Sequence, residues 1–258
     1  MSSDPTRPPA LRPPPHQLEP LFQRGAEAQA RGRTRAALRD WRRAAHAGHP
    51  RAAAALADHA SVTNRPRLAE HWWERAAQAG DPNSARLLAR RLVGRGETQR
   101  AAGLLEQAIL LGDPEAASEL GHLLAGEGRM DEALERYRSA AEAGSASGAF
   151  HLAVLLERAG HESGAQNWYR RACDAGHLGA ACNLGRLLAL RDDLAAARET
   201  WTEAAEAGHA GAAANLGILL LELGSWADGR RWLEEAAAAG GQRALRTLQR
   251  LDDSQETV

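Results

Sequence analysis

Histidine and cysteine are the residues of this sequence best suited to reactive chemistry. The chain carries 10 His and 2 Cys among its 258 residues. His122, His151 and Cys182 fall on one face of the first helices of successive predicted helix pairs, where they could supply acid, base and nucleophile. An enzyme or small-ligand sensor built on this cluster is therefore one hypothesis. No phosphate-binding or nucleophile-elbow motif accompanies the cluster, so no cofactor is predicted.

The spacing of the other histidines and cysteines does not indicate a metal site. His49, His177 and His209 each follow a glycine turn and lie whole multiples of 32 residues apart. We expect them to cap the helices that start after these turns. Cys173 and Cys182 flank a single turn and are predicted to be two free thiols. No metal ligand set is predicted.

Amide and guanidinium groups indicate a different chemistry, the recognition of a peptide. Asn183 and Asn215 occupy equivalent positions 32 residues apart. An amide offers a donor and an acceptor together, so such a ladder can pair with an extended backbone. Arg86, Arg90 and Arg186 could form bidentate bonds to a carboxylate. The alternative is that all five side chains are simply solvated.

The elements that must position these residues come from an internal repeat. Glycines recur every 32 residues, and columns of leucine and of aromatic or leucine residues keep the same phase. The glycines are Gly48, Gly80, Gly112, Gly144, Gly176, Gly208 and Gly240; the leucines, eight residues later, are Leu56, Leu88, Leu120, Leu152, Leu184, Leu216 and Leu248; the large residues, seven before each glycine, are Trp41, Trp73, Leu105, Tyr137, Tyr169, Trp201 and Leu233. Seven units of 32 residues therefore span residues 17–240.

Each unit is predicted to hold two helices. Residues 210–223 and 226–239 are apolar at helical spacing, and Gly224 separates them. A glycine just past a helix suits the left-handed C-terminal cap. Because a single pair cannot bury its apolar face, pairs must stack. The predicted fold class is all-α, a solenoid of seven helix-turn-helix repeats followed by a capping helix over residues 242–251.

The two ends of the chain differ from the repeats. Residues 1–16 contain six prolines and are predicted to be a disordered or polyproline-II tail. The solenoid is expected to occupy residues 17–251, and residues 252–258 form a polar tail. The opening segment lacks the apolar stretch of a signal peptide, which predicts a cytoplasmic protein.

Helix geometry selects an open face on the first helix of each unit. At about 100° per residue, columns five, eight, nine, eleven and twelve after each glycine share a buried arc, and columns six, seven, ten and thirteen face away from it. The open face carries Arg86, Arg90, Ser118, Glu119, His122, Phe150, His151, Val154, Cys182, Asn183, Arg186, Asn215 and Ile218. Phe150, Val154 and Ile218 are the predicted apolar anchors of a peptide-binding groove, because exposed apolar groups among polar ones often mark interfaces.

The repeat resembles the tetratricopeptide-repeat superfamily and, within it, the Sel-like repeats. The matching positions of one unit are Ala181, Leu184, Gly185 and Leu188, then Ala197 and Trp201, at the spacing of W-x2-L-G-x2-Y…A-x3-F. The ending AAEAGH at residues 204–209, followed by NLG at 215–217, is similar to the Sel-like variety. The resemblance implies a right-handed superhelix whose first helices line a concave groove. It also implies a scaffold or adaptor role and peptide binding by the asparagine column.

Composition narrows the classes of partner. The chain has 32 basic and 33 acidic residues and a formal net charge of -1. It offers no broad positive field for nucleic acid or an anionic membrane, and neither is a predicted partner. All basic residues are arginine, which indicates a GC-rich coding sequence such as that of a bacterial source. A hydrophobic content of 44% is enough for a continuous core.

These observations predict a non-enzymatic scaffold or adaptor that binds a peptide or helix of another protein in the groove. The alternatives are the His122, His151 and Cys182 site and a solenoid that self-assembles through its stacked ends. Because the expected capping helix presents Arg243, Arg246 and Arg250 to solvent, we expect a monomer or a weakly self-associating chain.

Overall fold

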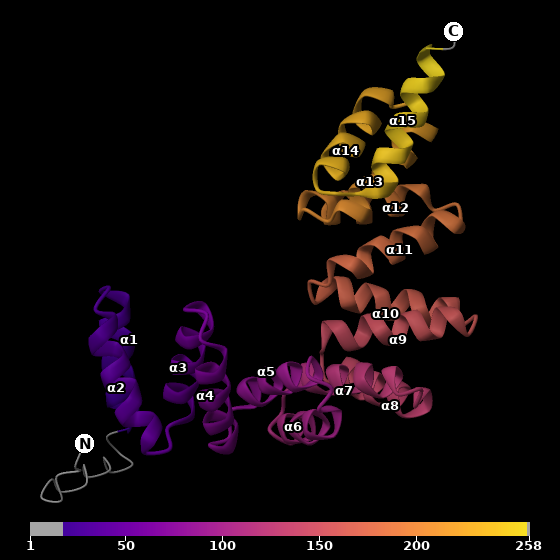
Figure 1. The fold of residues 1–258 in the computed structure, drawn as a ribbon. Helices are drawn as coiled ribbons and strands as arrows, with labels where there is room; N and C mark the ends of the chain where they lie inside the picture. Colours follow the sequence, from indigo (N-terminus) through magenta and orange to yellow (C-terminus); the bar gives the residue numbers. More distant parts are fainter. Residues whose placement is uncertain (1–17, 257–258) are drawn as a thin grey trace, which may run out of the picture. The chain divides into compact units, whose positions relative to one another are not determined.

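The computed structural model describes residues 18–256, of which residues 254–256 are described as backbone only. The predicted tail over residues 1–16 lies outside this part of the chain. The described residues are helical apart from short turns, and the chain forms two compact units, Met1–Leu123 and Leu124–Val258. This confirms the predicted all-α fold of seven helix pairs and a final helix (Figure 1).

The helices of the two units follow one another at nearly constant intervals. In the first unit they are α1 (Leu18–Ala30), α2 (Thr34–His46), α3 (Pro50–Val62), α4 (Pro66–Gln78), α5 (Pro82–Val93) and α6 (Thr98–Leu110). The boundary between the units falls within α7 (Pro114–Gly126). In the second unit they are α8 (Met130–Glu142), α9 (Ala146–Arg158), α10 (Glu162–Asp174), α11 (Leu178–Leu190), α12 (Leu194–Glu206), α13 (Ala210–Glu222), α14 (Trp226–Ala238) and α15 (Gln242–Glu256).

The turns between helices share one backbone conformation. Every sixteenth residue from Gly32 to Gly240 has a positive φ, in the left-handed region that a Cβ disfavours. Twelve of these positions are glycine, and the other two are Asn64 at 54° and Asp192 at 62°. Asparagine and aspartate tolerate this region better than other side chains do. The true spacing of the turns is therefore 16 residues, half of the repeat seen in the sequence.

The core of each unit is built from the leucine and aromatic columns. Leu56, Leu88, Leu152, Leu184 and Leu216 are at most 5% exposed. The large residues of the second helices are buried as well, except Trp73, which is half-buried. Consecutive helices pack against each other in both units, and α11 also packs on α13, and α13 on α15. The predicted register of the repeat is therefore confirmed.

Two tryptophans lie directly over a glycine of the preceding helix. A Cβ added at Gly185 would come within 2.6 Å of Cε2 of Trp201, and one at Gly25 within 2.5 Å of the Trp41 ring. The close approach lets the indole donate a hydrogen bond to a backbone carbonyl. The Nε1 of Trp201 lies 3.1 Å from the backbone oxygen of Cys182. The absence of a Cβ at Gly185 therefore allows both the close packing of the indole and this hydrogen bond.

One buried hydroxyl in the first unit has no hydrogen-bond partner among the described residues. It belongs to Ser84, which is 1% exposed. Equivalent positions in other repeats hold Ala52, Ala116, Ala180 and Ala212, all buried.

Replacing Ser84 with alanine is expected to raise the free energy of unfolding by about 1 kcal/mol, because an unsatisfied buried hydroxyl carries its full desolvation cost. Chemical denaturation measures this change. The matched control is Ser145→Ala, which removes an Oγ that accepts from the Gly148 N–H at 2.8 Å and should cost about 1 kcal/mol. Destabilisation by both changes would contradict the assignment of Ser84.

The last helix is longer than the sequence predicted. It runs to Glu256, five residues past the expected end of the capping helix at residue 251. No glycine or proline follows Gly241 to end the helix, and Arg230 of α14 pairs with Asp252 at 2.8 Å. Residues 252–256 of the expected polar tail are thus part of α15.

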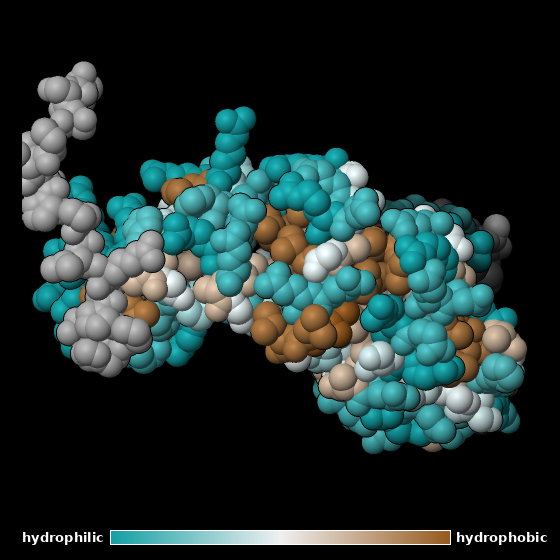
Figure 2. Space-filling model, turned by 90° about the horizontal axis from the view of Figure 1, so that it is seen from below, coloured by the Kyte–Doolittle hydropathy of each residue, from teal (hydrophilic) through white to brown (hydrophobic). Residues whose placement is uncertain are grey.

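The described surface is mostly polar. On the face shown in Figure 2, polar side chains surround several apolar patches. Large apolar residues that are well exposed include Val62, Leu110, Leu190 and Trp226. Within residues 18–256, no helix has both the length and the apolar character needed to cross a bilayer.

Candidate peptide-binding face

The first helix of most repeats begins with a side chain that caps it. His49, His177 and His209 accept a hydrogen bond at Nδ1 from the backbone N–H three residues later, at 3.1–3.2 Å. Asp81 and Ser145 do the same with a carboxylate and a hydroxyl oxygen. The predicted capping role of the three histidines is confirmed. Among the described residues, no group of three or more His, Cys, Asp or Glu side chains could hold a metal ion.

These caps also contact the preceding repeat. The ring of Phe150 stacks on His177 with centroids 4.3 Å apart and an interplanar angle of 14°. In the first unit Phe22 stacks in the same way on His49, at 5.1 Å and 17°. A third repeat uses charge instead, since Arg86 Nε lies 2.8 Å from Asp113 Oδ2. In each case a residue of one first helix meets the residue that follows a glycine turn 27 positions later in the chain.

This contact corrects the assignment of column six to the open face. Phe150 is half-buried between its neighbours, and Ser118 of the same column is 3% exposed. The column is covered because the next first helix starts directly over it. The sequence contained a signal for this, the matched types Phe with His and Arg with Asp, always 27 residues apart. Column ten is the more open one, with Arg90, His122 and Arg186 exposed.

In the first unit the arginines of the predicted groove are compensated by acids of the next repeat. Arg86 pairs with both Asp113 and Glu119, and its side chain is 17% exposed. Arg90 pairs with Glu119 at 2.6 Å and is 57% exposed. Burial works to lower the pKa of Arg86, but the bonds to Glu119 and Asp113 outweigh it and raise that pKa overall. Arg86 therefore has a structural partner, and Arg90 is the more accessible cation.

In the second unit a polar network crosses the same face. The Asn183 amide donates to Tyr169 Oη at 3.1 Å, and Tyr169 Oη donates to Glu157 at 2.8 Å. Arg186 forms an ion pair with the other oxygen of Glu157. Burial, followed by the neighbouring carboxylate, raises the pKa of Tyr169, so its hydroxyl remains protonated and available as a donor. The network holds Asn183 and Arg186 in fixed positions.

Asn215 is more enclosed than the sequence predicted. It is 9% exposed, its amide donates to Cys182 Sγ at 3.3 Å, and Arg243 donates to its Oδ1 at 2.6 Å. Both asparagines of the predicted ladder are thus already hydrogen-bonded within the protein. A partner backbone that pairs with Asn215 must first displace Arg243.

The surroundings of the predicted reactive cluster do not favour nucleophilic chemistry. Both cysteines are free, and burial raises the pKa of Cys182. The ring of His151 lies against Tyr137 at 4.8 Å and Phe150 at 5.2 Å, whereas His122 belongs to the other unit. A thiol with a raised pKa is a poor nucleophile at neutral pH. Burial raises the pKa of Cys173 as well, to about 11.

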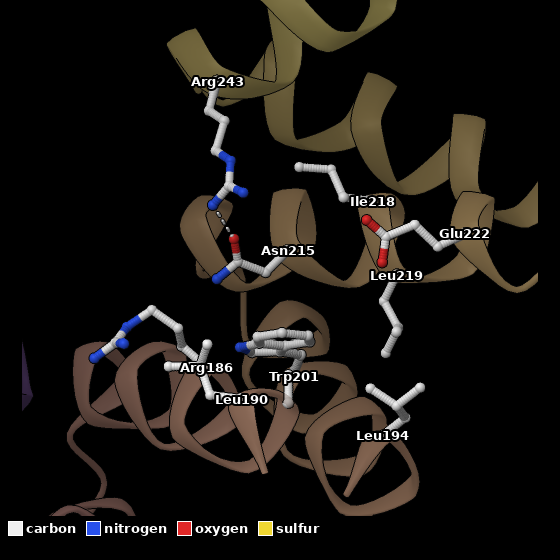
Figure 3. Close-up of a pocket in the computed structure, with 10 residues that line it drawn as sticks. Arg186, Leu190, Leu194, Trp201, Asn215, Ile218, Leu219, Glu222 and Arg243 are labelled. Atoms are coloured by element: carbon white, nitrogen blue, oxygen red, sulfur yellow. Dashed lines mark hydrogen bonds between the residues drawn. The ribbon is translucent and has the colours of Figure 1, made fainter. Parts of the chain in front are cut away.

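The second unit contains a pocket on its first-helix face, hereafter the C-terminal pocket. It has a volume of about 370 Å³ and lies among α11, α12, α13 and α15 (Figure 3). Its lining residues are Arg186, Ala189, Leu190, Leu194, Trp201, Asn215, Ile218, Leu219, Glu222 and Arg243. Three of them, Arg186, Asn215 and Ile218, are among the residues predicted from the sequence. Leu190 and Trp201 were missed because they fall outside the four open columns.

Taken together, this architecture is that of a repeat protein whose helix pairs present one face of their first helices. The chain has the fold of the tetratricopeptide and Sel-like repeat superfamily. No family model matches the sequence, and no curated protein is similar to it in sequence.

Solved structures share this fold at low sequence identity. One is c5321, a protective antigen of uropathogenic Escherichia coli with an SLR fold: it is 24% identical, has a TM-score of 0.72 and aligns over 85% of this chain. The chain spans 53% of that protein. A Sel1 repeat protein from Oxalobacter formigenes is 20% identical with a TM-score of 0.72, over 84% of this chain and 99% of its own. The APC/C hetero-tetramer Cut9–Hcn1 is 14% identical with a TM-score of 0.60, over 91% of this chain and 46% of that one.

Proposed function

We propose that this protein is a non-enzymatic interaction module that binds an extended peptide or helix of another protein along its first-helix face. The observation that carries this proposal is the C-terminal pocket, whose apolar wall the described chain leaves open. Leu190 is 74% exposed at its rim, and Ile218 and Trp201 line it. Apolar groups ringed by polar ones are typical of interaction sites.

The remaining residues of the predicted groove are assigned supporting roles. In the first unit they are Arg90, His122 and, behind its acidic partners, Arg86. In the second unit they are Asn183, Arg186, Asn215, Phe150, His151, Val154 and Ile218. Phe150 supports the face through its stacking on His177, while Val154 and Ile218 provide apolar contact. A rigid stack of helices reduces the ordering cost of binding. Cut9, which shares the fold, assembles with Hcn1 in a hetero-tetramer.

The experiment is a quantitative capture of partners from native lysate with three forms of the full chain. The test variant combines Leu190→Ser with Ile218→Asp, which makes the pocket polar. The control is Leu110→Ser, a leucine on α6 that is 88% exposed. Circular dichroism and thermal unfolding establish that all three forms are folded.

We expect the pocket variant to lose at least about 90% of the partners held by wild type, a change of about 1.4 kcal/mol or more in binding. The α6 control should keep them. Equal retention by all three forms would contradict binding at this face. Light scattering of the purified chain would show a concentration-dependent rise in mass if self-assembly were the function instead.

A further inference from the structure

The two ends of the C-terminal pocket carry opposite charges that form no ion pair with the side chains described here, those of residues 18–253. Arg243 of α15 donates one hydrogen bond to Asn215 but forms no ion pair with the described residues. Glu222, at the last turn of α13, forms no ion pair within residues 18–253 either. Arg186, by contrast, is compensated by Glu157. Figure 3 shows Arg243 and Glu222 on opposite sides of the pocket.

Apolar side chains occupy the space between these charges. Ile218 and Leu219 extend from α13, and Trp201, Leu190 and Leu194 lie on the facing side (Figure 3). Trp201 is 5% exposed and is fixed by its hydrogen bond to Cys182. A volume of about 370 Å³ suits one bulky side chain with its flanking backbone, whereas a helix needs a groove about 10 Å wide.

The distance between Arg243 and Glu222 determines how far apart the acidic and basic residues of a ligand must lie. Asn215, which holds Arg243, and Glu222 are seven residues apart on α13, or about 10 Å at 1.5 Å per residue. An extended chain covers that distance in about three to four residues. Arg243 and Glu222 would then each lie beside an opposite charge of the ligand. The ligand residue between those two charges would enter the pocket.

We propose that the C-terminal pocket binds an extended segment of a partner protein with an acidic side chain beside Arg243, a bulky apolar side chain in the pocket and a basic side chain beside Glu222. This inference rests on the proposed function and specifies its partner by chemistry. The acid and the base are three or four residues apart, and the apolar residue lies between them. The asymmetry of the charges selects one direction of the chain.

The test uses two peptides with blocked ends and a fluorescent label on a flexible linker, SDSLSRS and its reverse-order counterpart SRSLSDS. Binding to the full chain is followed by fluorescence anisotropy. We expect both peptides to bind, each in the chain direction that places its aspartate beside Arg243 and its arginine beside Glu222; the tighter binder is the better peptide in the comparisons that follow. Alanine in place of leucine should weaken the better peptide about tenfold, as expected for removing a buried apolar side chain.

A charge exchange provides the decisive comparison. Glu222→Lys should weaken binding of the better peptide about fivefold, the scale of one accessible ion pair. Changing the peptide's arginine to glutamate should restore binding to this variant while it weakens binding to wild type. The matched control is Glu235→Lys on α14, an exposed glutamate outside the pocket lining, which should change neither affinity.

Three outcomes would overturn the proposal: no binding of either peptide to wild type, equal effects of Glu222→Lys and Glu235→Lys, or no rescue by the exchanged peptide. Failure of this inference is distinct from failure of the proposed function. If the Leu190→Ser, Ile218→Asp variant loses captured partners but neither peptide binds, the face is an interaction site for a ligand of other chemistry.

Discussion

Replacing Gly185 with alanine should lower the free energy of unfolding by about 2–4 kcal/mol. The added Cβ would overlap the Trp201 ring. Gly185 belongs to α11 and Trp201 to α12, and because these helices pack against each other, neither residue can easily move away. Overpacking of this kind costs about 1–3 kcal/mol. Displacing the indole also breaks its hydrogen bond to the Cys182 carbonyl, which adds about 1 kcal/mol. Urea denaturation followed by circular dichroism measures the sum.

The chain offers both a control and a compensating change. Gly103 lies in α6 with nothing within 4 Å of an added Cβ, so Gly103→Ala should stabilise by about 0.5–1 kcal/mol through helix propensity. In the third repeat, alanine and leucine occupy the equivalent positions, Ala89 and Leu105, and both are buried. Adding Trp201→Leu to Gly185→Ala should therefore recover at least about half of the loss. Simple additivity of the two changes would contradict the proposed contact.

The second large effect concerns the joint between the third and fourth repeats. Arg86→Phe is expected to cost about 2–3 kcal/mol, because it leaves Asp113, which is 12% exposed, without its guanidinium and leaves Glu119, which is 20% exposed, with Arg90 alone. Asp113→His alone should also destabilise, since it removes the other half of the ion pair. Together the two changes create the Phe–His pair that the structure shows at Phe22 with His49 and at Phe150 with His177.

The double variant should regain at least about 1 kcal/mol relative to the sum of the single changes, a coupling typical of residues in contact. Denaturation of the four proteins of this cycle measures it. Arg90→Phe is the control: its side chain is 57% exposed, so its loss should cost less than about 1 kcal/mol. A coupling free energy of zero would mean that the column-six side chain and the capping side chain contribute independently to stability.

Much of the fold was predictable because the repeats of one sequence can be compared with one another. The leucine and aromatic columns gave the register, and the turn glycines gave the helix ends. The histidine caps followed from their place after each glycine. Helix periodicity placed Arg186, Asn215 and Ile218 on one face of their helices, and all three line the C-terminal pocket.

The rest depended on contacts between repeats, which periodicity does not contain. Helix geometry placed Phe150 on an open face, but the first helix of the next repeat, α11, starts over it with His177. Asn64 and Asp192 occupy two of the turn positions that are otherwise glycine. The glycines alone therefore do not give the 16-residue spacing of the turns. Asn215 is enclosed by Arg243, and that contact comes from α15, which lies outside the repeat. Leu190 and Trp201 belong to the pocket only because two repeats meet there.

The local nature of these joints has a consequence for biosynthesis. Each helix packs mainly on its neighbours in the chain, and each joint of the Phe150 and His177 kind closes within 27 residues. A nascent chain can therefore complete one repeat after another as they leave the ribosome, without waiting for distant segments. The C-terminal pocket is then the last feature to form, because Arg243 arrives only with α15. During translation, helices α1 to α14 would therefore fold before the chain acquires Arg243, the cation at the rim of its proposed binding site.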